Sequence, residues 1–374
     1  MGFKMVREDL LSEFSELEDP RLDRLKKYPL CEIIFLSIYG VIQQVQSWRG
    51  LEILGTNRLE ELREFFPFEE GIPSHQTLGR VFSILKPKTF EKFFSIWSRM
   101  LVDGKIDYIA IDGKTVRGSS SRTHDAIHIL HACAIDYGVS LAQVAVGSKT
   151  NEITMLAEII DAIDAKDTII SVDALLTQKH IADKIIASKA DYTMALKANH
   201  KNLHGEVVEN FDLCHPDKKS RLEHTEKQNG RITQRVYDVI KLEENMISAF
   251  DEWKGLSSIG RVVSHVTKEH KITTMTRYFL LSYDSVATFS KSCRGHWGIE
   301  SYHWILDVVF KEDKDKKRTD HAPRNFSLIR KFSLNMLRKF KQKLSTPNAQ
   351  IQCMTNREFR LEMLESSGFK RKIF

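Results

Sequence analysis

Three acidic residues are the first candidates for chemistry in this chain of 374 residues. Asp112 and Asp173 each end a short apolar stretch that is typical of a buried strand, and Glu300 lies in a later segment rich in histidine and tryptophan. An unpaired buried carboxylate costs several kcal/mol unless a cation or hydrogen bonds compensate it. Because Mg²⁺ prefers carboxylate oxygens as ligands, the three acids together predict a metal site.

Two of these acids also have purely structural explanations. Asp112 precedes Gly113, so its side chain can cap the backbone of a turn. Asp173 can in the same way be the N-cap of a helix that follows it. The sequence leaves these explanations open for each residue, and it is the combination of three acids that favours a site for two metal ions acting on a phosphodiester.

The sequence allows three interpretations of the surroundings of Glu300. On a helix it would share one face with His296, one turn before it, and with His303, one turn after it. It could instead pair with Arg294 while the neighbouring tryptophans anchor the core. A further interpretation takes His296, Glu300 and His303 as the face of a transition-metal site that would bind zinc.

The composition is that of an ordinary globular protein, with 42% hydrophobic and 28% charged residues and enough length for two domains or one domain with an insertion. No run of about 18 apolar residues and no signal-peptide stretch is present, so we expect a cytoplasmic protein without membrane association. The five cysteines form no C-x-x-C pair, which predicts free thiols. A Walker lysine loop is also lacking, so nothing favours nucleotide hydrolysis.

Positive charge is concentrated in one part of the sequence. The net charge is +6, yet residues 311–343 hold twelve Lys or Arg and only four Asp or Glu, a surplus of eight positive charges. This basic segment is a candidate phosphate-binding surface. A solvated helix face is the alternative explanation.

The spacing of apolar residues divides the chain into a helical part and an α/β part. Residues 1–100 predict a helical N-terminal domain in which Ser74 caps one helix. From about residue 105, strand-like stretches follow one another and then alternate with helices, which is typical of an α/β fold. A β-rich insertion is predicted at about 200–290 and a C-terminal tail at 346–374. The expected strands of the α/β part are 108–112, 126–135, 139–146, 168–173 and 191–197, with helices at 152–163 and 180–188.

A set of short motifs runs along nearly the whole chain in a specific order. They are Asp19-Pro-Arg21, Lys27-Tyr-Pro-Leu30, Gly71-Ile-Pro-Ser-His75, Ala110-Ile-Asp-Gly-Lys-Thr-Val-Arg-Gly118, Asp173-Ala174, Ala195-Leu-Lys-Ala-Asn199, Arg294-Gly-His-Trp-Gly-Ile-Glu300 and His303-Trp-Ile-Leu-Asp-Val308. In these motifs the sequence resembles the insertion-sequence transposases of the ISAs type, also called H-repeat-associated proteins, which belong to the DDE transposases.

The resemblance implies an α/β, RNase H-like catalytic core over residues 101–345, with the β-rich insertion inside it and the helical domain before it. In such a core Asp112, Asp173 and Glu300 are the catalytic residues and bind Mg²⁺, for which Mn²⁺ can substitute. The implied reaction is cleavage and strand transfer of double-stranded DNA at terminal inverted repeats, by a homodimer in the bacterial nucleoid, with the N-terminal domain contacting DNA ends. The residues expected to contact DNA are Lys114, Arg117, Lys197, Arg294, His296, Lys314, Lys316, Lys317 and Arg318.

The sequence departs from the wider family around the glutamate. Related transposases have tyrosine, arginine and lysine there in a Tyr-x2-Arg-x3-Glu-x6-Lys pattern, whereas this chain has Cys293, His296 and Asp307 at those positions. Arg294 is the expected substitute for the arginine. The alternative function is a domesticated or inactive relative, which would bind DNA in a salt-sensitive way without metal-dependent cleavage.

Overall fold

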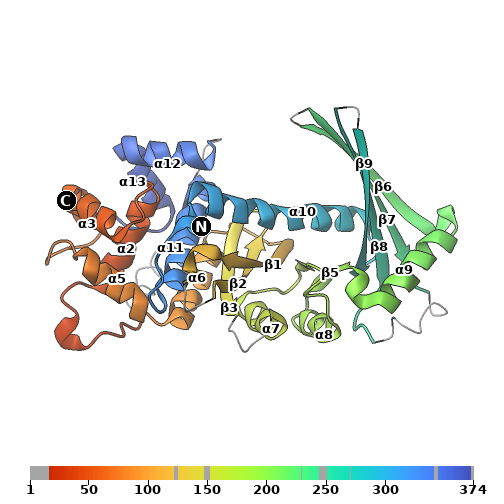
Figure 1. Ribbon diagram of the computed structural model, residues 1–374, viewed down its shortest axis with the longest axis horizontal. Coiled ribbons are helices and arrows are strands. Elements are labelled where there is room, and N and C mark those ends of the chain that lie inside the picture. Colours follow the sequence, from red (N-terminus) through yellow and green to blue (C-terminus); the bar gives the residue numbers. More distant parts are fainter. Residues whose placement is uncertain are drawn as a thin grey trace.

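The computed structural model describes residues 17–121, 125–146, 152–228, 230–243, 250, 252–269, 271–340 and 344–371. Figure 1 shows a helical unit at one end, a sheet at the centre and a group of long strands at the other end. One long helix, α10 (Val286–Trp304), runs across the sheet and links these parts. The fold is therefore mixed α/β around one large sheet. In the described part of the chain, no helix is both long and apolar enough to cross a membrane.

The helical unit is built around α2 (Leu30–Val41). From Ile33 to Val41 every residue of this helix is buried, because its apolar residues lie on all sides and need other helices around them. Ser74 begins one of these helices as expected, since its Oγ accepts a hydrogen bond from the backbone N–H of Thr77 at 3.3 Å. The surrounding helices are α3 (Trp48–Asn57), α4 (Leu59–Arg63), α5 (His75–Ile84) and α6 (Pro87–Met100).

The C-terminal segment belongs to the same unit and differs from the tail expected at 346–374. It forms α12 (Thr346–Thr355) and α13 (Arg357–Ser366), which lie beside the N-terminal helices in Figure 1. Buried Arg360 donates to both carboxylate oxygens of Glu61, at 2.6 and 2.7 Å. The indole N–H of Trp97 donates to the carbonyl of Ser367 at 3.2 Å. The sequence could not show this, because the partners lie about 270 to 300 residues away.

The central sheet has nine strands in the order β3-β2-β1-β4-β5-β9-β8-β7-β6. The first three strands in the chain pair antiparallel, whereas β1, β4 and β5 are parallel neighbours. This arrangement of β1 to β5 fits an RNase H-like core. The strands are β1 (Tyr108–Val116), β2 (Ile127–Ala134), β3 (Val139–Val146), β4 (Ile169–Val172) and β5 (Asp191–Leu196).

The two faces of the sheet are covered by different helices. Helices α7 (Glu152–Ala162) and α8 (Lys179–Ala187) pack on one face, and α10 and α11 (Ala322–Phe340) pack on the other. In β1, Ile109 and Ile111 belong to the core on the α7–α8 side, while Ala110 packs with residues of α10 and α11. Because strand side chains alternate, Asp112 shares the face of Ala110 and lies toward α10.

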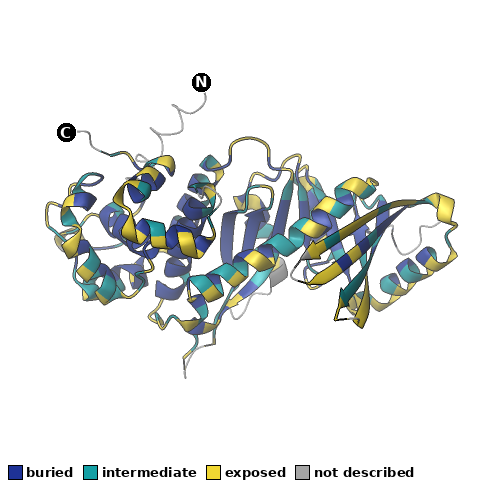
Figure 2. Cartoon of the chain, turned by 90° about the horizontal axis from the view of Figure 1, so that it is seen from above, coloured by how far each residue is buried: buried dark blue, intermediate teal, exposed yellow. Residues whose placement is uncertain are grey.

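The insertion extends the sheet rather than forming a separate layer. Its last strand pairs antiparallel with β5, and the others follow as an antiparallel meander. The outer part of this meander is largely exposed in Figure 2, and its inner part packs on Phe289 at the start of α10. The insertion contains α9 (Lys201–Leu213), β6 (Lys219–Gln228), β7 (Arg231–Lys241), β8 (Ser258–Lys268) and β9 (Lys271–Leu281).

Candidate active site

The two aspartates lie on neighbouring strands, at the point where the parallel pairing of β1 and β4 ends. The parallel pairing of β1 and β4 matches Ile111 with Val172, so Asp112 and Asp173 are the next residues on neighbouring strands. Asp112 has a side chain that is 23% exposed. The carboxyl ends of adjacent parallel strands are where open α/β sheets bind ligands. The structure thus brings the two aspartates together as the sequence predicted.

Backbone N–H groups hold both carboxylates, but the two structural explanations are not realised as expected, because Gly113 lies within β1 rather than in a turn and the N-cap of α8 is Gln178 rather than Asp173. The backbone N–H of Gly113 donates to Asp112 Oδ1 at 2.9 Å. The N–H groups of Leu175 and Leu176 donate to Asp173 Oδ1 at 3.1 and 3.0 Å. These three backbone hydrogen bonds all end on the Oδ1 atom of a carboxylate. These hydrogen bonds therefore hold the two side chains in place and are compatible with a further role for their Oδ2 atoms.

Glu300 reaches the site from the other side of a cavity. This cavity has a volume of about 460 Å³ and is lined by Asp173, Glu300, Lys197 and Arg277, among others. Glu300 is exposed on α10. Among the described residues, no group of three or more His, Cys, Asp or Glu side chains is arranged to hold a metal ion. The arrangement therefore joins the acids in pairs, Asp112 with Asp173 at the sheet edge and Asp173 with Glu300 across the cavity.

The histidines beside Glu300 face the sheet. His296 Nδ1 lies 3.0 Å from Ser171 Oγ, and burial lowers the pKa of His296 to about 4 against the opposing charge of Asp173. His303 Nε2 lies 3.0 Å from His131 Nδ1. Both rings thus have partners in the sheet, and the zinc face proposed for His296, Glu300 and His303 is not assembled in the described structure. The ring of His296 is held against β4 and also lines the cavity that Asp173 and Glu300 share.

Three arginines surround the indole of Trp297. The guanidinium carbons of Arg235, Arg277 and Arg294 lie 4.9, 5.1 and 5.6 Å from its ring centre. Arg294, which the sequence offered as a DNA contact or a partner of Glu300, pairs instead with Glu226 at 2.8 Å. Arg235 and Arg277 were missed by sequence reasoning, since they come from strands of the insertion and no local motif marks them.

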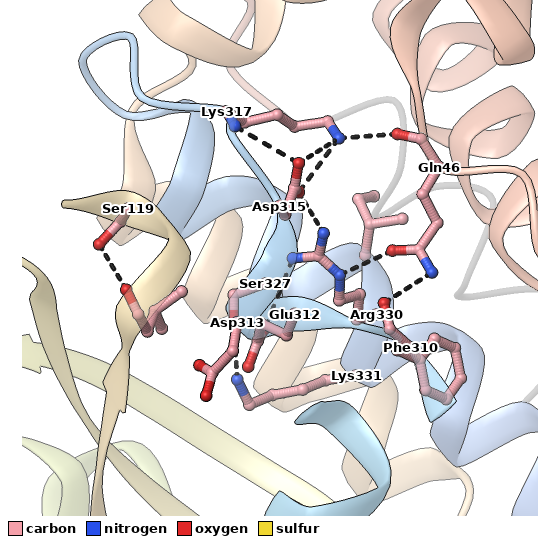
Figure 3. Close-up of polar contacts among 12 residues, drawn as sticks. Gln46, Ser119, Phe310, Glu312, Asp313, Asp315, Lys317, Ser327, Arg330 and Lys331 are labelled. Atoms are coloured by element: carbon pink, nitrogen blue, oxygen red, sulfur yellow. Dashed lines mark hydrogen bonds and ion pairs between the residues drawn. The ribbon is translucent and has the colours of Figure 1, made fainter. Parts of the chain in front are cut away.

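Much of the basic segment is internal, as Figure 3 shows for its central residues. We call the buried charge cluster the group formed by Lys114, Asp307, Glu312, Asp315, Lys317, Arg330 and Lys331. Lys317 donates to the carbonyl oxygen of Gln46 at 2.7 Å and to Asp315 at 3.1 Å. Arg330 pairs with Asp315 and approaches Glu312 at 3.6 Å. These contacts tie the loop after α10 to the helical unit.

Lys114 is the member of this cluster that the sequence placed on DNA. Its ammonium group pairs with Asp307 and lies 3.2 Å from Glu312, and its side chain is 6% exposed. The side chain of Lys317 is similarly 7% exposed. Both expected DNA contacts are therefore corrected, because their charges are already neutralised inside the protein.

Burial and neighbouring charges perturb the cluster strongly. Burial alone would raise the pKa of Glu312, but the charges of Lys331, Lys114 and Arg330 outweigh it and lower the pKa to about 2. Burial lowers the pKa of Lys317 and of Lys331 to about 8, although an acid opposes the shift in each case. The carboxylate of Glu312 thus remains ionised because three cations surround it.

The other lysines and arginines that were expected to contact DNA are exposed. Arg117 has a side chain that is 80% exposed, with its Nε 3.8 Å from Asp313. Lys197 is exposed at the cavity. We call the exposed basic rim the set Arg117, Lys314, Lys316 and Arg318, all of which are exposed. Lys341 and Lys343 of the basic segment lie outside the described residues.

The rim is held beside β1 by close packing of two short helices, η2 (Arg117–Ser119) and η7 (Glu312–Lys314). Gly118 allows this approach, since a Cβ there would overlap the carbonyl oxygen of Asp315. This is a structural reason for the glycine that ends the motif around Asp112.

The three unusual positions around Glu300 now have local explanations. Cys293 is buried among the side chains at the start of α10, where burial raises its pKa to about 12. His296 contacts Ser171, and Asp307 pairs with Lys114. Where the wider pattern has a lysine, this chain has Asp307, and its cationic partner is Lys114 on β1.

Comparison with known proteins shows the family to which the chain belongs. Residues 11–98 match the family described as DDE_Tnp_1-associated, and residues 103–336 match the family described as Transposase DDE domain. The chain belongs to the DDE transposases. It is a DNA-cleaving transposase of the insertion-sequence type, and enzymes of this family generally use divalent metal ions.

Several relatives match nearly their whole length. The chain is 36% identical to "Putative transposase YncI" of Escherichia coli O157:H7, over 90% of this chain and 89% of that one. It is 35% identical to "H repeat-associated putative transposase YhhI" of Escherichia coli K12, over 89% of this chain and 91% of the relative. These relatives confirm the H-repeat-associated group that the motifs indicated.

A solved structure of a piggyBac transposase synaptic complex with hairpin DNA is also similar, with a TM-score of 0.42 and 11% identity over 96% of this chain and 78% of that chain. Agreement at this level carries no argument about the fold or the mechanism of this transposase.

Proposed function

We propose that this transposase cleaves DNA at the terminal inverted repeats of its own insertion sequence and transfers the ends to a target, using Mg²⁺ at Asp112, Asp173 and Glu300. The observation that carries the proposal is the register of β1 and β4, in which Asp112 and Asp173 directly follow the paired residues Ile111 and Val172. Glu300 supports it, because it shares a cavity with Asp173. Mn²⁺ should substitute, since it also accepts oxygen ligands.

The carboxylates fit a hard divalent cation in their chemistry. Mg²⁺ is usually held by one or two protein carboxylates together with water and substrate phosphate, so a complete cage of protein ligands is not required. The paired arrangement of Asp112, Asp173 and Glu300 supplies such a partial set. When bound, the metal ions would activate a water or 3′-hydroxyl and stabilise the leaving oxygen of the phosphodiester.

The basic residues near the acids suit the phosphate backbone. Lys197 and Arg277 line the same cavity as Asp173 and Glu300, so a phosphodiester there would meet cations as well as carboxylates. The exposed basic rim follows β1 and can continue this contact along the DNA. Phosphate contacts of this kind fix the position of DNA without reading its sequence. We assign Lys197 and the rim to this role, with Arg277 added to the residues inferred from the sequence.

The direct test uses DNA that carries both ends of the element with their flanking sequence. The purified transposase is incubated with this DNA in Mg²⁺, in Mn²⁺ or in chelator, and cuts are mapped to single nucleotides. We expect metal-dependent cuts at the ends, and none with Asp112→Asn, Asp173→Asn or Glu300→Gln. The matched controls Asp212→Asn and Glu362→Gln change exposed acids elsewhere and should cut normally.

Binding separates this proposal from the alternative of a DNA-binding relative that no longer transposes. The three acid variants should keep salt-sensitive binding to the end DNA, because they lose no cation. Normal cutting by any of them would overturn the proposed site. Binding of wild-type protein without cuts in either metal would instead favour the inactive relative.

We also propose that two copies pair the two ends. Mixing end fragments of two different lengths should then give a complex of intermediate mobility that contains one of each fragment. Complexes that contain only a single fragment under all conditions would contradict a homodimer on DNA.

A further inference from the structure

A line of polar side chains leads from the interior of the sheet to Asp112. Asp112 on β1 lies directly opposite His131 on β2, and both belong to the face covered by α10. His303 on α10, one turn after Glu300, lies between them. Its Nδ1 is 3.7 Å from Asp112 Oδ2, and its Nε2 is 3.0 Å from His131 Nδ1. His131 Nε2 in turn lies 2.7 Å from Ser140 Oγ on β3.

The inner part of this line is rigidly held. His131 and Ser140 are completely buried, and the side chain of His303 is 12% exposed. The backbone N–H of Ser140 donates to Asn335 Oδ1 at 2.9 Å, and its carbonyl accepts from Asn335 Nδ2 at 2.9 Å. Ser140 is therefore fixed by α11, and it fixes the two imidazoles in sequence.

The chemistry of the groups determines the direction of the hydrogen bonds. The 3.0 Å contact between His303 Nε2 and His131 Nδ1 requires one of these nitrogens to donate and the other to accept, and a neutral imidazole has one N–H and one acceptor nitrogen. An ionised carboxylate only accepts, so the favourable arrangement points the Nδ1–H of His303 at Asp112. His303 Nε2 must then accept from His131 Nδ1–H, and His131 Nε2 must accept from the hydroxyl of Ser140.

The opposite direction would place a lone pair of His303 against the carboxylate. Both histidines would then carry their proton on Nε2, and His303 would repel the acid that it faces. The two arrangements thus differ in the tautomer of both rings, which is a measurable property.

We propose that His303 is a positioning residue for Asp112, held in its Nδ1–H tautomer by a hydrogen-bond chain that runs from Ser140 through His131. The contact at 3.7 Å is longer than a hydrogen bond and acts as an electrostatic guide. With the N–H of Gly113 on Oδ1 and His303 facing Oδ2, both oxygens of Asp112 are oriented. Partners of this kind orient the carboxylates that ligate metals, and their loss typically costs about 10- to 100-fold in metal affinity. This role rests on the proposed function of Asp112.

The first experiment tests the chain without any metal or activity. The full-length transposase is labelled with ¹⁵N-histidine, and the ring nitrogens of His131 and His303 are assigned with the variants His131→Gln and His303→Gln at pH 7. We expect a protonated Nδ1 and an unprotonated Nε2 in both rings. A protonated Nε2 on His303, or a charged ring, would overturn the proposal.

The second experiment measures Mn²⁺ binding to the DNA-free protein by electron paramagnetic resonance. His303→Leu should weaken binding about 10- to 100-fold, while His303→Gln, which keeps an N–H donor, should recover much of the loss. The control His180→Leu changes an exposed histidine on α8 and should bind like wild type. Equal loss in the Leu and Gln variants would show that His303 only fills space.

The variant Asp112→Asn distinguishes failure of the proposed metal site from failure of the positioning role of His303 alone. If Asp112→Asn leaves Mn²⁺ binding unchanged, the proposed metal site itself fails, and the positioning role fails with it whatever the tautomers are. If Asp112→Asn abolishes binding and His303→Leu does not alter it, only the positioning role is overturned.

Discussion

The acidic sheet edge and the buried charge cluster lie next to each other and use the same residue types in opposite ways. Asp112 and Lys114 are two residues apart on one face of β1. At the edge, Asp173 and Glu300 line an open cavity. In the cluster, Glu312 is fully buried and surrounded by Lys114, Arg330 and Lys331. Access to solvent and to outside cations therefore separates a carboxylate available for catalysis from one that holds the fold together.

The largest expected effect comes from replacing one carboxylate of the acidic sheet edge with an amide. Glu300→Gln should lower DNA cleavage by about 10³-fold or more, because a metal ligand supplies several kcal/mol of transition-state stabilisation. Glu300 is exposed, so urea unfolding should show little change in stability. Single-turnover cleavage assays and unfolding curves on the same preparation provide both measurements. If Glu300→Gln were strongly destabilised but cleaved DNA almost normally, Glu300 would stabilise the fold rather than take part in cleavage.

A Glu-to-Gln substitution in the buried charge cluster should instead lower the stability of the protein. Glu312→Gln leaves three buried cations short of one counter-charge, and breaking a buried ion pair costs about 3–5 kcal/mol of folding free energy. The midpoint of urea unfolding should fall accordingly, whereas Glu362→Gln on the surface should leave it unchanged. A wild-type midpoint for Glu312→Gln would mean that the cluster is not a stabilising element.

The candidate acids could be singled out from the sequence because each has a local signature, and their role at a metal site stays a prediction. Asp173 follows β4, which forms close to its expected range, whereas β1 continues to Val116 and so does not end at Asp112 as expected. Glu300 was found through its helix and the surrounding motif. The pairing of the aspartates followed from parallel strand order, which the alternation of strands and helices indicates.

Other features depend on contacts between distant parts of the chain, which local patterns do not reveal. Lys114 and Lys317 were assigned to DNA because a lysine in a sequence carries no sign of its partner, in this fold Asp307 and Asp315. Arg277 and the insertion strands reach the cavity only through the extended sheet. Helices α12 and α13 were missed because their stabilising partners, such as Glu61, are in the N-terminal unit.

The buried cluster should also make stability depend on acid pH. Glu312 has an ordinary pKa of 4.5 when unfolded and about 2 when folded, so the unfolded chain binds more protons between these values. Its stabilising contribution is fully present above pH 4.5 and is lost as the pH falls through about 2. The difference in unfolding free energy between wild type and Glu312→Gln should therefore shrink over this range. A difference that stays constant with pH would show that the pKa of Glu312 is the same in the folded and the unfolded protein.

The smallest expected effect concerns lysines that are neighbours in sequence and differ in burial. Lys316 is exposed in the basic rim, whereas the side chain of Lys317 is held by Asp315 and Gln46. If Lys316 contacts one phosphate, Lys316→Ala should reduce the slope of log affinity against log salt by about 0.9. Lys317→Met should leave this slope unchanged and lower stability instead, because Asp315 loses a buried partner. Binding titrations at several salt concentrations measure the slope. An equal loss of slope in both variants would mean that Lys317 leaves the cluster when DNA binds. Lys317 would then be internal in the free protein and would contact phosphate in the DNA complex.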